Sequence, residues 1–577
     1  EWRKTTLEER HRIMYEAANR LADMRGDLIG CMCAVTGKTV IEGDVEVSEA
    51  VDYARFYTTA MKKFAALDDV EMKPKGTILV ISPWNFPCAI PVGGIVAGLA
   101  GGNTVILKPA TVAAPVAWMF AKAFWDAGVP KEALQVIITN REALKVLTTA
   151  PAIKHIILTG GTDTAQNIAR ANPVTPLSAE TGGKNVIILT ASGDRDHAIM
   201  NIVASAFGNA GQKCSACSLL LVERSVYEDK NFQSKLKDAA TSLKVGSVWN
   251  PGNIVGPMIT NKNDKLLKAL ELEKGESWLV PPRFLDKHKY VLAPTVKWGV
   301  RPGNYSFRTE LFGPMLSVVC IENLQQGIDL VNSLEYGLTS GLQSLDEGEQ
   351  KLWKDSIMAG NLYINRGITG AIVNRQPFGG MKLSAFGGGV KAGGPNYCAC
   401  FVNIADKPGS TTDYTQSYVK AYEQEFAHAR DVNNLYGEQN AFRYLPLKNM
   451  VLRLFPGDNN EDAKMIALAA RICHTPLSIS FEPGDDRTAA LASLGCPLKE
   501  EALAGFLKSM KNYERIRTCG ADIPMEMYEE AARIDKYIAT AKPVKDGRVE
   551  LIHYIKEQSI SFEYHRYGSI LEVPPVE

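Results

Sequence analysis

Four apolar runs decide the fold: GTILVIS (76–82), NTVILKP (103–109), LQVIIT (134–139) and KHIILTGG (154–161). Segments with helical periodicity lie between or after these runs, at 91–100, about 114–127, 141–149 and 162–171. Continuous Val/Ile/Leu runs that alternate with helices are typical of a parallel sheet covered on both faces. We therefore predict an α/β fold whose first domain has a Rossmann-like, nucleotide-binding architecture, although the GxGxxG fingerprint is absent.

The same alternation continues after Gly183, with a helix near 196–208 and the strand SLLLVE (218–223). The turn-rich stretch DKPGSTTDYTQS (406–417) is the best linker, and a βαβ-like unit with a further strand near 550–555 follows it. We expect a nucleotide-binding domain at 1–55 and 75–182, a small β-arm for oligomerisation at 56–74 and 397–404, a catalytic α/β domain at 183–396, a linker at 405–431 and an extra C-terminal α/β domain at 432–577.

Composition narrows the class of protein. The chain has 577 residues, and its 64 Lys+Arg balance its 64 Asp+Glu, so it lacks the basic excess of a nucleic-acid-binding protein. A hydrophobic content of 46% and a mean hydropathy of −0.09 exclude a largely disordered or membrane-embedded protein. The apolar stretch Phe86–Leu107 has no charged residue but is interrupted by prolines and glycines, so we interpret it as a buried helix and strand rather than a membrane span.

The first residues of the chain and the pattern of its cysteines indicate the cellular compartment of the protein. The sequence begins at Glu1 without a signal peptide, and we expect that it starts part-way into a longer gene product. Its 11 cysteines show no disulfide-scaffold rhythm, which favours reduced thiols and a cytoplasmic protein.

Five short motifs occur in order: WNFP (84–87), LKP (107–109), ETGGK (180–184), GQKCSA (211–216) and ELFGP (310–314). Together they resemble the aldehyde dehydrogenase superfamily, and the resemblance covers residues 1 to about 404. It implies the fold of that family, with a dinucleotide-binding domain, a catalytic thiol domain and a β-arm that makes a homodimer or a domain-swapped assembly.

Aldehyde oxidation needs a nucleophile, donors for an oxyanion and a base that activates water. Cys214 is the candidate nucleophile, Asn85 with the Cys214 N–H the oxyanion donors, and Glu180 the general base. Cys214 and Cys217 also form a CxxC pair, but no second CxxC completes a zinc site, so we predict no metal. What lowers the pKa of the thiol is not evident from the sequence.

The resemblance also implies cofactor residues. Lys108 and Glu310 match the pair that binds the ribose hydroxyls, and Phe312 would pack beside the nicotinamide. The other expected cofactor-binding residues are Ser82, Pro83, Trp84, Gly160, Gly161 and Gly182. Gly161 replaces the usual serine, and Thr111 stands where NAD-preferring members often carry a glutamate. NAD is therefore favoured, and NADP stays open.

The segment 367–397, GITGAIVNRQPFGGMKLSAFGGGVKAGGPNY, resembles the Δ1-pyrroline-5-carboxylate dehydrogenase branch, which oxidises L-glutamate γ-semialdehyde. Gly370 and Ala371 would offer backbone N–H groups to the substrate carboxylate, Ser215 a hydroxyl, and Phe378 an apolar contact. Another semialdehyde, such as succinate semialdehyde, is the alternative substrate. A CoA-acylating relative should lack Glu180, and a non-catalytic scaffold would not need to keep all of these residues.

The C-terminal extension resembles the tail of proline utilisation A, ending in YHRYGSI (564–570). That resemblance implies a bifunctional parent protein in proline catabolism. It would have a proline dehydrogenase domain in the same polypeptide, whose FAD would lie in an N-terminal part outside this sequence, and a peripheral association with the membrane. For the extension itself we expect a lid or docking role that screens a channelled intermediate.

Overall fold

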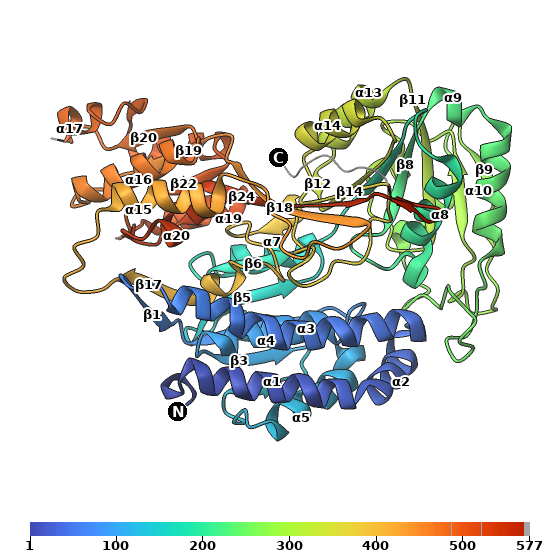
Figure 1. Cartoon of the computed structure of the whole chain (residues 1–577), viewed down its shortest axis with the longest axis horizontal. Helices are drawn as coiled ribbons and strands as arrows, with labels where there is room; N and C mark the ends of the chain where they lie inside the picture. Colours follow the sequence, from blue (N-terminus) through green and yellow to red (C-terminus); the bar gives the residue numbers. More distant parts are fainter. Residues whose placement is uncertain (486, 521, 571–577) are drawn as a thin grey trace.

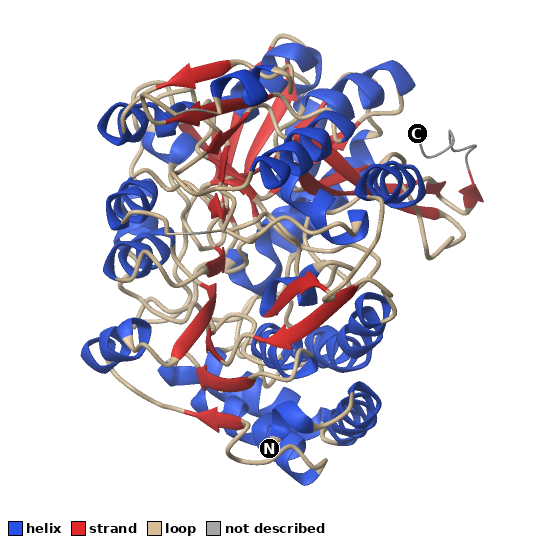
Figure 2. Ribbon diagram, turned by 90° about the vertical axis from the view of Figure 1, so that its left-hand side faces the viewer, coloured by secondary structure: helices blue, strands red, loops and turns tan. Residues whose placement is uncertain are grey.

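The computed structural model describes residues 1–485, 487–520 and 522–570. Three sheets of five or more strands form the interior of this part of the chain, and helices cover them on the outside (Figure 2). The prediction of an α/β fold is confirmed. In the described residues, no helix combines the length and hydropathy that crossing a membrane requires.

The first sheet has the strand order β16-β6-β5-β2-β3-β4. The chain builds β2, β3 and β4 outward in one direction, then returns to place β5 on the other side of β2, so the order reverses between β2 and β5. The strands are β2 (Thr77–Ile81), β3 (Thr104–Lys108), β4 (Leu134–Val136), β5 (Ile153–Thr159), β6 (Leu177–Glu180) and β16 (Ala385–Phe386). Ligands of open parallel sheets bind at the carboxyl ends of strands where the order reverses.

Helices surround this sheet, and an N-terminal helical layer lies beneath it in blue (Figure 1). The apolar helix α4 is buried between β2 and the long helix α3 except at the half-buried Ile90, so neither of its faces needs polar residues. The helices of this domain are α1 (Leu7–Asp23), α2 (Arg25–Thr36), α3 (Val40–Ala65), α4 (Ala89–Ala100), α5 (Ala114–Asp126), α6 (Arg141–Thr149) and α7 (Thr162–Ala171).

The second sheet has nine strands in the order β18-β24-β14-β13-β7-β8-β11-β10-β9. Its main strands are β7 (Asn185–Leu189), β8 (Cys217–Glu223), β9 (Ser277–Val280), β10 (Thr295–Trp298), β11 (Met315–Ile321), β13 (Thr339–Gln343) and β14 (Asn361–Ile364). Its main helices are α8 (Arg195–Phe207), α10 (Lys230–Ser242), α13 (Leu324–Ser333) and α14 (Glu347–Ser356). Short elements complete it: α9 (Arg224–Tyr227), α11 (Asp264–Ala269), α12 (Tyr305–Arg308), β12 (Tyr336–Gly337) and β15 (Met381–Lys382).

Two strands of this sheet come from the C-terminal part of the chain. β24 (Ile555–Glu563) pairs in parallel with β14, and β18 (Glu438–Pro446) pairs antiparallel with β24. Figure 1 shows both strands running from the orange C-terminal unit into the sheet that also contains β14. The expected boundary at 432 therefore does not separate two independent sheets, because β14 would be an open edge without β24.

The remainder of the C-terminal part forms a third, parallel sheet with the order β21-β20-β19-β22-β23. Its strands are β19 (Met450–Arg453), β20 (Leu477–Phe481), β21 (Leu498–Glu500), β22 (Arg515–Arg517) and β23 (Ile538–Ala539). Its helices are α16 (Asn460–Ile472), α17 (Thr488–Ala492), α18 (Leu503–Ser509), α19 (Met525–Arg533) and α20 (Gly547–Glu550), and the hairpin β25–β26 (His565–Arg566 and Ser569–Ile570) follows β24.

Three expected segments differ in the structure. The arm consists of β1 (Val70–Pro74) paired antiparallel with β17 (Val402–Asp406), whereas 56–65 continues helix α3 and 397–401 is a 3₁₀ helix. The residues at 57, 60, 61 and 64 are all buried, which is the spacing of a helix face. The arm is therefore shorter than 56–74 and 397–404.

The expected linker 405–431 contains helix α15 (Tyr414–Ala421). The Asp413 side chain caps the helix by accepting the N–H of Thr415, and the buried Tyr418 hydroxyl donates to the Val544 carbonyl at 2.7 Å. The strand expected near 550–555 begins only at Ile555, as β24, because Asp546 caps a helical turn whose continuation reaches Tyr554.

Candidate active site at the domain junction

The carboxyl ends of β2 and β3 place Ser82 and Lys108 side by side. The Ser82 N–H donates to the Lys108 carbonyl at 3.2 Å, and the Ala110 N–H donates to the Ser82 carbonyl at 3.1 Å. The Ser82 hydroxyl is buried without a hydrogen-bond partner. Lys108 is half-buried, and this burial lowers the pKa of its ammonium group. Both side chains therefore lie where the strand order reverses and have polar atoms available to a ligand.

Gly160 and Gly161 lie beside them, after β5. The Gly160 N–H donates to the Glu180 carbonyl at 3.1 Å, which joins the ends of β5 and β6. Gly161 is the N-cap of α7, where no side chain caps the helix, and a Cβ placed on it would meet no atom within 4 Å. Open N–H groups at a helix N-terminus suit a phosphate, so the serine that Gly161 replaces is not required for this contact.

Glu310 belongs to the second domain, and its side chain lies at the carboxyl ends of the strands of the first sheet. Its Oε1 accepts the Gly183 N–H at 2.9 Å, and a Cβ on Gly182 would lie 2.3 Å from its Oε2. Glycine at 182 is therefore needed for this approach. The burial of Glu310 raises the pKa of its carboxyl group.

Phe312 also joins the two domains. Its ring contacts Trp84 edge to face, with the ring centroids 5.8 Å apart, and its backbone has a positive φ of 52°. Pro83 connects Trp84 to Ser82, whose hydroxyl has no hydrogen-bond partner. The free hydroxyl, the uncapped helix and the Gly182 cradle are together compatible with a dinucleotide that extends from α7 to Phe312.

Cys214 lies in a tight loop after α8. Asn209, Ala210 and Gly211 have φ values of 51°, 54° and 66°, three consecutive residues in the left-handed region. A Cβ on Gly211 would lie 2.2 Å from the Gly313 carbonyl oxygen. This strained backbone brings the loop of Cys214 against the loop of Phe312, and such strain often occurs at functional sites.

Asn85 is buried at the same junction. Its side-chain Nδ2 donates to the Gln212 carbonyl at 3.0 Å, two residues before Cys214. Its own carbonyl accepts the Nζ of Lys38 at 2.8 Å. The structure thus places the proposed oxyanion donor beside the nucleophile loop and fixes it from both sides.

The Cys214 thiol is protonated at neutral pH in this arrangement. Removal from solvent, followed by the negative charges of Glu310 and Glu180, raises its pKa to about 12, against the lowering effect of the Ser215 and Cys214 N–H groups. The Lys213 ammonium does not oppose this shift, because it is paired with Glu42 at 2.7 Å. Adjacency in sequence therefore does not make Lys213 an activator of the thiol.

Glu180 ends β6 and lies at the same junction. Its Oε2 accepts the Gly380 N–H at 3.0 Å, and its charge contributes to the raised pKa of Cys214. Desolvation raises the pKa of Glu180, and the positive charge of Lys391 opposes this rise. A carboxyl group that ionises nearer to neutral pH is suited to accept a proton from water.

The model of the aldehyde dehydrogenase family matches residues 1–406. The chain belongs to the aldehyde dehydrogenase family. The 1-pyrroline-5-carboxylate dehydrogenase of Geobacillus sp. (strain WCH70) is 35% identical over 417 residues, 69% of this chain and 80% of that protein. Its counterpart in Bacillus subtilis (strain 168) is 33% identical over 417 residues, with the same coverage of 69% and 80%.

Two solved structures extend this comparison. Proline utilization A (PutA) from Corynebacterium freiburgense has a TM-score of 0.88 and 36% identity, and the match covers 99% of this chain but 58% of that protein. A Thermus 1-pyrroline-5-carboxylate dehydrogenase with bound NAD has a TM-score of 0.66 and 32% identity, covering 70% of this chain and 82% of that protein. The present chain thus spans less than two thirds of the PutA it matches.

In this aldehyde dehydrogenase, the expected substrate residues lie around the loop after β14. Gly370 is exposed with a φ of 95°, and Ala371 follows it half-buried. Phe378 is half-buried and exchanges two backbone hydrogen bonds with Ala392, at 2.8 and 2.9 Å. Ser215 is buried next to the nucleophile, and its carbonyl accepts the Thr339 hydroxyl at 3.4 Å.

Several residues of the site carry no motif that would have revealed them. Asn185 donates from Nδ2 to the carbonyls of Cys214 and Ala216, at 2.6 and 3.1 Å. Lys38 forms a buried ion pair with Glu46 at 2.5 Å, and Glu46 also accepts the N–H groups at the start of α4. Asn185 directly follows ETGGK, the one signal that pointed toward it.

Glu49 is a further carboxylate that the sequence reading did not consider. It lies on α3 and hydrogen-bonds Tyr53, while desolvation and the negative charge of Glu46 raise its pKa to about 8. A Cβ on Gly393 would lie 3.3 Å from the Val373 Cα and 3.7 Å from the Tyr53 ring. Glu49 is therefore one helical turn from Tyr53, whose ring lies beside Gly393.

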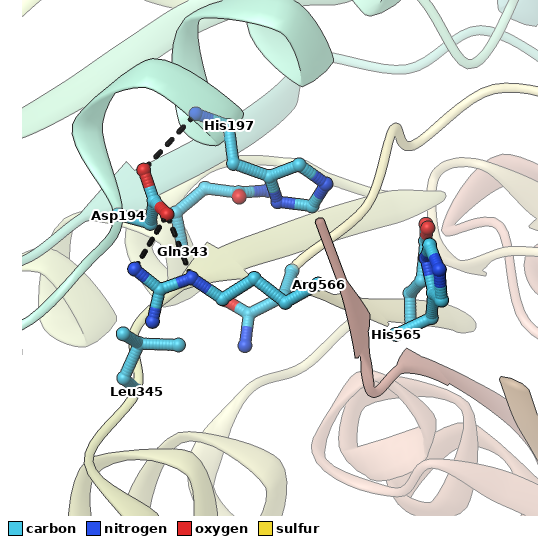
Figure 3. Close-up of a pocket in the computed structure, with 8 residues that line it drawn as sticks. Asp194, His197, Gln343, Leu345, His565 and Arg566 are labelled. Carbon is cyan, nitrogen blue, oxygen red and sulfur yellow. Dashed lines mark hydrogen bonds and ion pairs between the residues drawn. The ribbon is translucent and has the colours of Figure 1, made fainter. Parts of the chain in front are cut away.

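A small cavity elsewhere does not compete as a substrate site. It lies between α8, β13 and the C-terminal hairpin, and Arg566 crosses it to bind Asp194 at 2.7 Å (Figure 3). Its free volume is about 10 Å³, which holds no more than a single water molecule.

Proposed function

We propose that this aldehyde dehydrogenase oxidises L-glutamate γ-semialdehyde to L-glutamate, with NAD as the hydride acceptor and a cysteine thioester as intermediate. The observation that carries the proposal is the meeting of Cys214, Asn85 and Glu180 at the junction of two α/β domains, beside a loop that can bind a carboxylate. The names of the similar proteins, 1-pyrroline-5-carboxylate dehydrogenases, support the substrate.

The covalent steps follow from the chemistry of these side chains. The Cys214 thiol first loses its proton to solvent, and its sulfur attacks the aldehyde carbon. The Asn85 amide and the Cys214 N–H donate hydrogen bonds to the oxygen that becomes negatively charged. The dinucleotide supplies the acceptor for the hydride that leaves this carbon. Glu180 then takes a proton from water as the water attacks the thioester carbonyl, and Cys214 leaves as the thiolate.

Cofactor residues are proposed in the same way. Lys108 and Glu310 would bind ribose hydroxyls, and the N–H groups at Gly161 would bind the pyrophosphate. Phe312 and Trp84, which pack edge to face, would confine the nicotinamide next to Cys214. To bind the ribose hydroxyls, the Glu310 carboxylate would leave the Gly183 N–H.

We propose that groups of complementary polarity bind the two charged groups at the far end of the substrate. The N–H groups of Gly370 and Ala371 would bind its α-carboxylate, and Ser215 would add a hydroxyl. Glu49 would pair with its α-ammonium, because a desolvated carboxyl group gains most from the approach of a cation. Phe378 would pack against the aliphatic chain between the two ends.

We also propose that the chain belongs to a larger bifunctional protein, with a proline dehydrogenase domain and its FAD. The match to PutA over 99% of this chain supports that proposal. The C-terminal unit would then act as a lid. It already rests on the catalytic region, because Arg515 donates to the Gly388 carbonyl at 2.7 Å and Gln166 of α7 donates to Asp535 at 2.8 Å.

The test is NADH formation with L-glutamate γ-semialdehyde, run in parallel with succinate semialdehyde and with NADP. We expect the glutamate semialdehyde and NAD to give the highest kcat/KM, and Cys214→Ala to abolish turnover. A higher kcat/KM with succinate semialdehyde would be consistent with the proposed mechanism but would overturn the proposed substrate. Turnover that survives in Cys214→Ala would overturn the mechanism itself.

A further inference from the structure

Three ionisable groups from three parts of the fold lie near one another: the half-buried Glu180, proposed above as the base, and the buried Lys391 and Glu557. Glu180 ends β6 of the first sheet, Lys391 lies in the loop after β16, and Glu557 is on the C-terminal strand β24. Lys391 and Glu557 are 1% and 4% exposed. Two carboxyl groups thus share the interior with one ammonium group.

Lys391 binds the chain segment, Gly379–Gly380, that also binds Glu180. Its Nζ donates to the Asn361 Oδ1 at 2.8 Å and to the Gly379 carbonyl. A Cβ on Gly379 would lie 3.0 Å from the Glu180 Oε1 and 3.1 Å from the Lys391 Cγ, so the two side chains flank this glycine. The next N–H along, that of Gly380, binds Glu180.

Glu557 fixes Lys391 from the opposite side. Its Oε2 accepts the Lys391 backbone N–H at 2.6 Å, and its Oε1 accepts the Asn396 side chain at 2.7 Å. The parallel register of β24 on β14, with Ser559 opposite Asn361, brings this carboxylate to the loop. Glu557 therefore touches the catalytic region only because the C-terminal strand completes the second sheet.

The charges of the three groups are interdependent. Desolvation raises the pKa of Glu180 and of Glu557 and lowers that of Lys391, while the ammonium lowers both carboxyl pKa values. Glu180 also faces Cys214, Tyr53 and Tyr397, which are neutral at pH 7 because each of their pKa values is raised. Glu557 also faces Arg548 across the Asn396 side chain. Lys391 is the one cation among these three groups, so a change in the charge of either carboxyl group alters the pKa of the other.

We propose, on the basis of the role assigned above to Glu180 as the water-activating base, that Glu557 is a positioning residue for that base. It holds the Lys391 backbone at the segment where Gly379 separates Lys391 from Glu180, and it places a second negative charge near the same lysine, and so sets how readily Glu180 gives up its proton. The C-terminal extension thereby adjusts the strength of a base that lies in another domain.

The test compares the pH dependence of kcat in two variants under conditions where thioester hydrolysis limits turnover. Glu557→Gln removes a negative charge near Lys391 and Glu180, so the pKa of Glu180 falls. The acid limb of the kcat–pH profile therefore moves to lower pH, by on the order of one unit. Lys391→Met removes the ammonium charge, so the limb moves to higher pH. Shifts in the same direction, or a lower plateau with an unmoved limb, would overturn the proposal.

Matched variants separate charge from packing. Glu514→Gln removes the neighbouring, more exposed carboxylate that pairs with Lys556 at 2.6 Å, and it should leave the limb in place. Lys391→Arg keeps the positive charge and should restore most of the wild-type profile. An unmoved limb in Lys391→Met would show that the lysine acts only by packing.

A second measurement needs no turnover. Infrared difference spectra between the wild type and Glu180→Gln report the protonated Glu180 carboxyl group, and its band is titrated with and without Glu557→Gln. We expect the band to disappear at lower pH in Glu557→Gln. If the wild type oxidised no aldehyde, the proposed function would fail, while this titration would still decide the role of Glu557.

Discussion

The side-chain amide of Asn185 donates a hydrogen bond to the carbonyl oxygen of Cys214, at 2.6 Å. Its Oδ1 accepts the Thr339 N–H at 3.1 Å, so one side chain ties the nucleophile loop to strand β13. A Cβ on Gly183 would lie 2.8 Å from the same Cys214 carbonyl and 2.6 Å from the Asn185 Oδ1, which leaves the loop little room to move. Asn185 therefore positions the sulfur without touching it.

Asn185→Asp tests this role. The aspartate keeps the shape but loses the donor to the Cys214 carbonyl, and a lost buried hydrogen bond of this kind costs about 1–3 kcal/mol. We expect kcat to fall about tenfold to a hundredfold, with KM for NAD unchanged. Asn172→Asp is the control, because Asn172 makes a similar bond to the Thr148 carbonyl at 2.7 Å far from the loop. Equal losses in the two variants would contradict a positioning role.

The Cys214 thiol gives a prediction about pH. With a pKa of about 12, the reactive thiolate is scarce at neutral pH, so the rate of alkylation by iodoacetamide should rise tenfold per pH unit from pH 7 to 10 without a plateau. Peptide mass spectrometry separates Cys214 from the other half-buried thiols, such as Cys31 and Cys320. A plateau near pH 8 would show an activating group that the present arrangement lacks.

NAD should accelerate this alkylation. The negative charge of Glu310 is one cause of the raised thiol pKa, and ribose hydroxyls bound to Glu310 would draw that carboxylate away from Gly183. Glu310→Gln should increase the rate without NAD and reduce the further gain on its addition. If NAD slowed alkylation equally in both proteins, simple shielding of the thiol would explain the result instead.

The core of the fold could be read from the sequence, but its long-range pairings could not. Continuous apolar runs located β2, β3 and β5 to within two residues, because strands buried on both faces need no polar alternation. For β24 the sequence predicted a strand that begins and ends too early, and it did not predict the partner strand. Gln558, Ser559 and Ser561 are buried among the apolar residues of β24 and hydrogen-bond other chain segments, and its partner β14 lies nearly two hundred residues earlier.

In the candidate site too, local motifs could be predicted from the sequence and long-range contacts could not. Residues inside compact motifs, such as Asn85 and Cys214, are brought together at the junction as expected. Lys38 and Lys391 bind other elements of the fold, whereas Glu49 contacts Tyr53 of its own helix. A single charged residue in a helix or a glycine-rich loop has no local signature. Only the packing of α3 and of the 379–396 loop against the sheet reveals them.

Glu49 provides a test of substrate recognition. Glu49→Gln should raise KM for L-glutamate γ-semialdehyde about tenfold or more, because it removes the charge that would face the ammonium group, and should leave KM for propionaldehyde unchanged. Asp44→Asn is the matched control on the same helix, since Asp44 is exposed and pairs with Arg25 at 2.6 Å.

The pH dependence of KM adds a second readout for Glu49. Its pKa in the free protein is about 8, so the carboxylate available for an ammonium group declines as pH falls below that value. KM for the semialdehyde should therefore rise toward lower pH in the wild type but not in Glu49→Gln. A parallel rise in the two proteins would assign the effect to another group.

Removal of the C-terminal strands should disable a site that lies in other domains. Truncation after residue 437 deletes β18 and β24, which exposes the hydrogen-bonding edge of β14 and leaves the Lys391 backbone N–H without Glu557. Exposed edge strands promote aggregation. We therefore expect an aggregation-prone protein whose soluble fraction has little activity, measured by size-exclusion chromatography and NADH formation. Truncation after residue 564 removes only the hairpin and its contact with Asp194, and should retain most activity. A monodisperse, fully active 1–437 fragment would contradict the view that the extension completes the catalytic domain.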